Sequence, residues 1–143
     1  MAALVITPGN VLLGTGGKQL TVIAGETITQ GMAVYKQTSD NRYYKGNSTA
    51  AATSAVDGIS LNAASAGQPL EIMDVSKGGE IVIGAAVDLA KIYVLGSAVS
   101  GTIKPVDDVG TGEYVVVIGM AKTSTILLVD IIDPGDVAGG EVF

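Results

Sequence analysis

The chain contains no cysteine and no histidine among its 143 residues. Without cysteine it cannot form disulfides or a thiolate nucleophile, and without histidine it lacks the side chain best suited to proton transfer at neutral pH. The same two residue types are the usual ligands of zinc and copper. These absences exclude most catalytic and metal-binding classes. We therefore expect a protein that is not an enzyme and that holds no cofactor or metal.

Charged side chains are also scarce, at 15% of the residues, whereas an average soluble domain has about 25%. The mean hydropathy is correspondingly high, at +0.47. Even so, the longest apolar run, residues 114–121, is far shorter than the ~20 residues of a membrane-spanning helix. The first charged residue is Lys18, so no secretion signal is expected. We expect part of this apolar surface to contact protein rather than water.

The net charge of −6 is unevenly distributed along the chain. Residues 1–106 hold seven acidic and seven basic side chains, whereas residues 107–143 hold seven acidic side chains and only Lys122. A chain with no basic cluster and few aromatic residues is poorly suited to binding phosphates or stacking on bases. Neither nucleic acid nor an anionic membrane is expected as a partner. The acidic C-terminal third is expected to face solvent.

The residues that are abundant favour β-structure. Valine, isoleucine and threonine supply 43 residues, and 20 glycines are spread between them. Short β-branched segments separated by turn residues are typical of strands in a small all-β sandwich or barrel. The strands expected from this pattern are residues 20–23, 32–36, 42–45, 56–61, 70–75, 80–83, 91–95, 101–106, 114–121 and 125–131.

One segment, residues 47–55, is rich in alanine and has a possible N-cap at Asn47 or Ser48, which predicts one or two helical turns. A second helical turn is possible over residues 85–90. The two halves of the chain also resemble each other. Segments 25–28 and 32–36 match 84–87 and 91–95, and segments 56–60 and 69–72 match 117–121 and 126–129. Two similar β units are therefore expected, although shared composition is the simpler explanation of the match.

Segments that suggest a small-molecule site do not match a known motif. The glycine-rich run from Gly14 to Gln19 lacks the first glycine and the Ser or Thr of a phosphate-binding loop, and it lacks the third glycine of a dinucleotide-binding motif. Asn47 begins a formal glycosylation sequon, which has little meaning without a secretion signal. We interpret the glycine-rich run as a flexible joint.

Two groups of acidic residues have a possible chemical role. Asp130, Asp133 and Asp136 could in principle hold a hard cation such as calcium, but their spacing does not follow an EF-hand loop. Asp107 and Asp108 with Glu113 could be proposed as a carboxylate pair for hydrolysis. In both cases a solvated turn is the favoured interpretation.

The N-terminal arm, residues 1–19, is uncharged up to Lys18 and contains two apolar clusters. Burial of each such side chain is worth about 1.5–3 kcal/mol, so the arm is expected to lie on a protein surface. It either forms an edge strand of its own domain or adds to a neighbouring subunit or a larger assembly. The arm is followed by a β-domain, residues 20–133, and a C-terminal tail, residues 134–143. The candidate binding residues of the arm are Leu4, Val5, Ile6, Val11, Leu12 and Leu13.

Four segments of the chain resemble the head decoration, or cement, proteins of tailed bacteriophages. They are residues 24–35 (AGETITQGMAVY), 42–45 (RYYK), 56–64 (VDGISLNAA) and 66–72 (AGQPLEI), and the resemblance extends over about residues 20–131. It implies a compact, β-tulip-like domain preceded by the extended arm. It also implies a homotrimer that binds the major capsid protein at local symmetry axes on the outer surface of the phage head and stabilises the shell.

Two other classes stay open from the sequence. One is a different phage structural part, such as a head fibre base or a tail protein. The other is a surface β-module that binds carbohydrate, although the chain has no tryptophan, and the adjacent Tyr43 and Tyr44 are expected to face opposite ways on a strand. A hydrolase that uses only carboxylates is the least favoured class.

Overall fold

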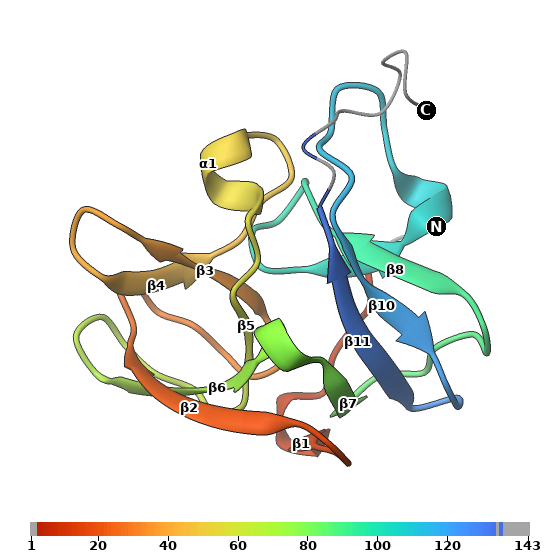
Figure 1. Cartoon of the computed structure of the whole chain (residues 1–143), viewed down its shortest axis with the longest axis horizontal. Coiled ribbons are helices and arrows are strands. Elements are labelled where there is room, and N and C mark those ends of the chain that lie inside the picture. Colours follow the sequence, from red (N-terminus) through yellow and green to blue (C-terminus); the bar gives the residue numbers. More distant parts are fainter. Residues whose placement is uncertain (1–2, 134, 136–143) are drawn as a thin grey trace.

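The computed structural model describes residues 3–133 and 135, apart from the side chain of Lys77. The described chain forms two antiparallel sheets that pack against each other as a sandwich, with one short helix (Figure 1). The sandwich predicted from the sequence is confirmed, and the alternative of a closed barrel is wrong. No helix in the described part of the chain is long and apolar enough to cross a membrane.

Each sheet comes mainly from one half of the sequence. The N-terminal sheet has the strand order β2 (Lys18–Ile23), β6 (Pro69–Asp74), β5 (Gly58–Ser60), β3 (Ala33–Gln37) and β4 (Arg42–Lys45). The C-terminal sheet has the order β1 (Val11–Leu13), β7 (Gly79–Ile83), β11 (Ile126–Ile132), β10 (Val117–Ala121), β8 (Ile92–Leu95) and β9 (Ile103–Pro105). The ten strands expected from the sequence are all present, β4 with the expected ends and the others with shifted ends, and β1 is the edge strand that was one of two alternatives for the arm.

The helical segments differ more from expectation. Helix α1 (Ala51–Ser54) is a single turn that follows Ala50, so neither Asn47 nor Ser48 caps it. The second expected turn, residues 85–90, is not helical, because its backbone donors bond to the β10–β11 hairpin instead. The Val87 N–H donates to the Ser124 carbonyl and the Ala90 N–H to that of Ala121. Three 3-10 turns occur at Pro8–Asn10, Val75–Lys77 and Val106–Asp108.

The two similar β units predicted from the sequence are present. Strands β2–β6 have the order β2-β6-β5-β3-β4, and strands β7–β11 repeat it as β7-β11-β10-β8-β9. The register repeats as well, because Val34 opposes Gly58 in one unit and Tyr93 opposes Gly119 in the other. The pairing of β10 with β11 differs, because its register is shifted by two residues relative to the pairing of β5 with β6. The shift lies next to a register irregularity between Val117 and Gly119.

The main core lies between the two sheets. The N-terminal sheet contributes Ala33, Ile59 and Met73, which are fully buried in one cluster with side chains of the C-terminal sheet such as Ile81 and Leu127. Because side chains alternate along a strand, the opposite face of the N-terminal sheet forms a second, smaller core around Val34, Leu70 and Ile72. The packing of one unit on the other is thus the main tertiary contact.

The N-terminal arm supplies backbone hydrogen bonds to the C-terminal unit at a place where the N-terminal unit bonds to itself. In the N-terminal unit, the Gly25 N–H donates directly to the Tyr43 carbonyl. The equivalent residues of the C-terminal unit, Gly84 and Ile103, instead bond to the arm, since the Leu4 N–H donates to Ile103 and the Thr7 N–H to Gly84. The arm therefore completes the C-terminal unit.

We predict that Gly119→Ala destabilises the fold. Gly119 lies in β10, and a Cβ at this position would overlap the carbonyl oxygen of Leu128 on the neighbouring strand. Backbone cannot move aside as a flexible side chain can, so a loss of about 1–3 kcal/mol in the free energy of unfolding is expected. Urea unfolding measures this change.

The matched control is Gly9→Ala. No atom lies within 4 Å of a Cβ built at Gly9, so the change in stability should stay within about 0.5 kcal/mol. Equal unfolding midpoints for the two variants would contradict the close packing of β10 on β11.

Candidate assembly surface

The six candidate residues of the arm fall into two groups. Val11 is buried, and Leu4, Ile6 and Leu13 pack partly buried against the main core. Val5 and Leu12, in contrast, are 88% and 60% exposed. The arm is thus packed on its own domain through four of these side chains, and Val11 and Leu13 lie in its edge strand β1. Only Val5 and Leu12 remain available to a partner.

The arm is also shorter than the sequence indicated. Strand β2 begins at Lys18, so the expected boundary after residue 19 falls inside a strand. The connection from β1 is ordered by two backbone contacts, since the Gly14 N–H donates to the Glu80 carbonyl and the Glu80 N–H to the Thr15 carbonyl. The expected tail, residues 134–143, lies outside the described residues except for Gly135.

A larger apolar surface lies on the side of the C-terminal sheet that points away from the N-terminal sheet. We call this the outer face. Cross-strand neighbours share a face, and the pairing places Met120 between Ile92 and Leu128. Their exposed fractions are 44%, 41% and 42%, respectively. Sequence reasoning missed this surface, because the spacing of apolar residues does not show which strand face is covered.

A second row extends the outer face toward the arm. Leu12 opposes Val82 in the β1–β7 pair, and Val82 opposes Ile126 in the β7–β11 pair. Val82 and Ile126 are half-buried. The arm and the outer face therefore adjoin each other, and the ion pair of Glu80 and Lys122 lies among their apolar side chains. Contiguous exposed apolar patches on a folded protein commonly mark an interaction site.

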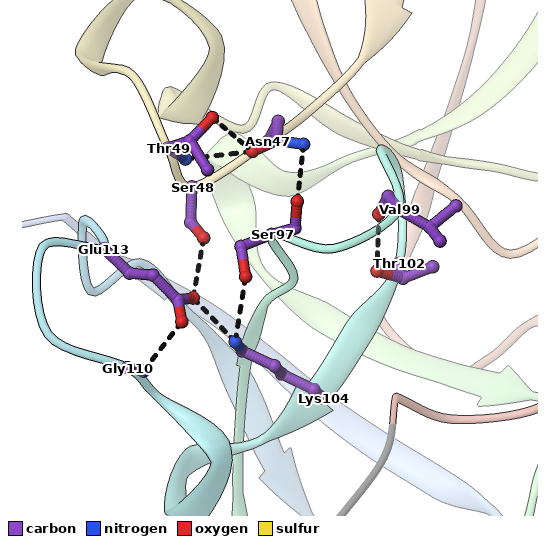
Figure 2. A network of polar contacts seen from close by, with 9 residues as sticks. All are labelled: Asn47, Ser48, Thr49, Ser97, Val99, Thr102, Lys104, Gly110 and Glu113. Atoms are coloured by element: carbon purple, nitrogen blue, oxygen red, sulfur yellow. Dashed lines mark hydrogen bonds and ion pairs between the residues drawn. The ribbon is translucent and has the colours of Figure 1, made fainter.

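The polar residues that suggested chemistry are used elsewhere. Glu113 and Lys104 form a largely buried ion pair, with Oε1 and Nζ 2.6 Å apart and side chains 13% and 9% exposed (Figure 2). Ser48 also donates to Glu113 Oε1, at 3.0 Å, and the Gly110 N–H donates to Oε2, at 2.7 Å. This network joins the loop after β4 to β9 and to the loop before β10, so it connects the two units.

The carboxyl group of Glu113 is held in its charged form. Burial by itself raises its pKa, but the hydrogen bonds from Lys104, Gly110 and Ser48 outweigh this effect, so the pKa lies below the usual value for glutamate. Asp107 is paired separately, with its Oδ2 atom 2.8 Å from Lys91 Nζ. Asp107 and Glu113 therefore pair with two different lysines. These contacts give no support to the two of them as a carboxylate pair for hydrolysis.

The other candidate motifs also have structural roles. Asn47 of the sequon accepts hydrogen bonds from the Thr49 N–H and hydroxyl and donates to the Ser97 carbonyl. Asp133 accepts from the Gly135 N–H, and Asp136 lies outside the described residues. Within residues 3–133, no group of three or more carboxylates is placed to hold a metal ion.

An open groove of about 670 Å³ lies where the ends of β6 and β11 meet. Its lining includes Asp57, Asp74 and Asp130 together with Leu20 and Tyr43. Asp57 accepts a hydrogen bond from the Lys36 N–H, and Asp74 accepts one from the Ser76 N–H. These two carboxylates thus stabilise the backbone around the groove.

Comparison of the chain with protein-family models, with curated proteins and with solved structures gave no match.

We predict that Glu113→Gln lowers the free energy of unfolding by about 3 kcal/mol at pH 7, because it leaves the ammonium of Lys104 buried without its counter-charge. Chemical denaturation measures the loss. The double variant Glu113→Gln with Lys104→Met removes both charges and should recover much of the stability. A double variant no more stable than the single one would show that the charge of Lys104 is not the cause.

The ion pair should also make stability depend on pH. Because the pKa of Glu113 is lower in the folded chain than the value of about 4.3 in an unfolded chain, the pair stabilises the fold above pH 4.3. This stability is lost as the pH falls through the folded pKa. The difference in unfolding free energy between wild type and Glu113→Gln should therefore shrink on acidification, and an unchanged difference from pH 7 to pH 3 would contradict this.

Proposed function

We propose that the protein is a structural virion protein that binds the outer surface of a phage capsid as a homotrimer and stabilises the shell. The observation that carries this proposal is the largely apolar surface made by Val5, Leu12 and the outer face. A non-enzymatic assembly protein needs such a surface and no reaction centre. The low charge density of the chain agrees with a protein that works with part of its surface covered.

The resemblance to decoration proteins supports the proposal through a whole structural unit. Its four segments lie in the N-terminal unit, where they include the β2–β3 connection, β4, β5 and β6. The C-terminal unit repeats the same strand order. The unit that carries the resemblance thus has the same strand order as the rest of the sandwich.

A trimer imposes a geometric condition on the binding surface. Three copies around an axis use two different patches on each copy, and the contact must close after three steps so that no fibre grows. The arm edge and the outer face adjoin each other on one side of the molecule. These two surfaces can serve as the two different patches that a contact closing into a trimer requires.

Binding of carbohydrate is less supported. Such modules present flat, exposed aromatic rings, whereas Tyr43 is buried in the smaller core. Tyr44 packs closely over Gly25, where a Cβ would overlap the ring, and it meets Tyr35 at a centroid distance of 6.1 Å with the rings tilted by 33°. These tyrosines contribute to packing within their own sheet.

The test is binding to capsids that lack decoration protein. Purified protein mixed with expanded shells should bind at a fixed ratio of copies per capsomer and appear as density on the outer surface in cryo-EM. No binding to any expanded shell would refute the proposal.

The role of the arm is tested with Val5→Lys, which places a charge on the most exposed apolar side chain of the described arm. We expect about tenfold or greater loss of capsid affinity, because a charge would be buried in the contact. The control is Leu89→Lys, at a side chain that is 70% exposed in the β7–β8 connection. Equal affinity of wild type and Val5→Lys would remove the arm from the binding surface.

A further inference from the structure

The two β units carry the same apolar row in two different surroundings. In the N-terminal sheet, Ile59 opposes Ala33 on one side and Met73 on the other. In the C-terminal sheet, Met120 opposes Ile92 and Leu128 in the same way. Leu128 and Met73 correspond in position but not in the sequence alignment of the two units. The shifted register of β10 and β11 places Leu128 opposite Met120, as Met73 lies opposite Ile59.

The burial of the two rows differs sharply. Ala33, Ile59 and Met73 are each 0% exposed, because the C-terminal sheet covers them. The row in the C-terminal sheet has side chains more than 40% exposed, and none of the described residues buries it. One chain has two such rows but only one neighbouring β unit, so one row stays uncovered.

The outer face is large enough to form the centre of a protein interface. With strands about 4.8 Å apart, the five strands from β1 to β8 span about 19 Å. Two adjacent apolar rows cover this width between them, one on β8, β10 and β11 and the other on β1, β7 and β11. A standard interface covers about 800 Å² on each partner and has an apolar centre with a polar rim. Asp130, which follows Leu128 on the same side of β11, falls in such a rim.

The outer face has little net charge, which decides what kind of partner fits it. Glu80 opposes Leu128 on this face, but its carboxylate is 2.5 Å from Lys122 Nζ, so the two charges compensate. A strongly charged partner would gain nothing here. A second copy, although it carries a net charge of −6, can bring a different uncharged apolar patch, the arm edge with Val5 and Leu12, as a trimer requires.

We propose that the outer face of the C-terminal sheet is the surface by which one copy binds a second copy of this chain. The inference rests on the self-association included in the proposed function and assigns it to named residues. The arm edge of the second copy, with Val5 and Leu12, covers Ile92, Met120 and Leu128. These three side chains are then buried between copies, as Ala33, Ile59 and Met73 are buried within one chain.

The test compares the mass of wild type, Met120→Lys and Ile23→Lys by sedimentation velocity over a range of concentrations. Met120 and Ile23 are 44% and 40% exposed, but Ile23 lies at the end of β2 in the other sheet, which makes it a matched control. Met120→Lys should weaken self-association by about 30-fold or more, as loss of a central interface residue does. Ile23→Lys should associate like wild type.

A measurement on the wild type guards against a variant that fails to fold. Oxidation of Met120 by dilute peroxide should be slow at concentrations where the protein associates and should accelerate on dilution. Met32, which is partly buried within its own chain, serves as the internal reference. An oxidation rate of Met120 that does not change with concentration would overturn the inference.

The failures of the two proposals are distinguishable. A wild type that is monomeric at all concentrations, or a folded Met120→Lys variant with unchanged mass, overturns the inference. If the wild type is monomeric and Met120→Lys loses affinity for capsids, the outer face binds the shell, and the proposed function stands without the inference. If Met120→Lys separates the copies but wild type binds no shell, the inference stands and the proposed function fails.

Discussion

The packing of one β unit on the other is the contact on which the rest of the structure depends. Each unit is a five-stranded sheet with apolar side chains on both faces, and only one face of each can be buried by the unit's own connections. The row of Ala33, Ile59 and Met73 is covered because it packs on the inner face of the C-terminal sheet. This single contact makes the main core and leaves the row of Ile92, Met120 and Leu128, on the outer face of the C-terminal sheet, exposed.

Two further features follow from that asymmetry. The C-terminal unit does not close on itself, so the arm bonds to Ile103 and Gly84, whose counterparts Tyr43 and Gly25 in the other unit bond to each other. The buried pair of Lys104 and Glu113 holds the loops of the two units together through Ser48. A buried pair of this kind fixes a particular arrangement, because any shift of one loop would leave a charge unpaired. Both features stabilise the relation between the units more than either unit alone.

The strands were predictable because their signals are local. β-branched residues and the glycines between them are sufficient to place ten strands, and the repeated spacing of about 60 residues indicated two units. The helical turn over residues 85–90 was wrong, because alanine propensity is weak compared with the hydrogen bonds that Val87 and Ala90 make to the next hairpin. Whether the arm forms an edge strand of its own domain could not be decided from the sequence, since the three residues of β1 become a strand only when β7 is beside them.

The sequence by itself determined that the chain is rich in β-strands and low in charge, that it has no cysteine or histidine, and that it begins with an apolar arm. It also determined the alternation of side chains along each strand, which is a property of the backbone. Only the tertiary structure decided which of two equivalent faces is covered. Ile59 and Met120 occupy matching positions in similar strands, yet one is buried and the other exposed. The difference arises because each sheet packs on the other through one face only. Ile59 points into this contact, whereas Met120 points away from it.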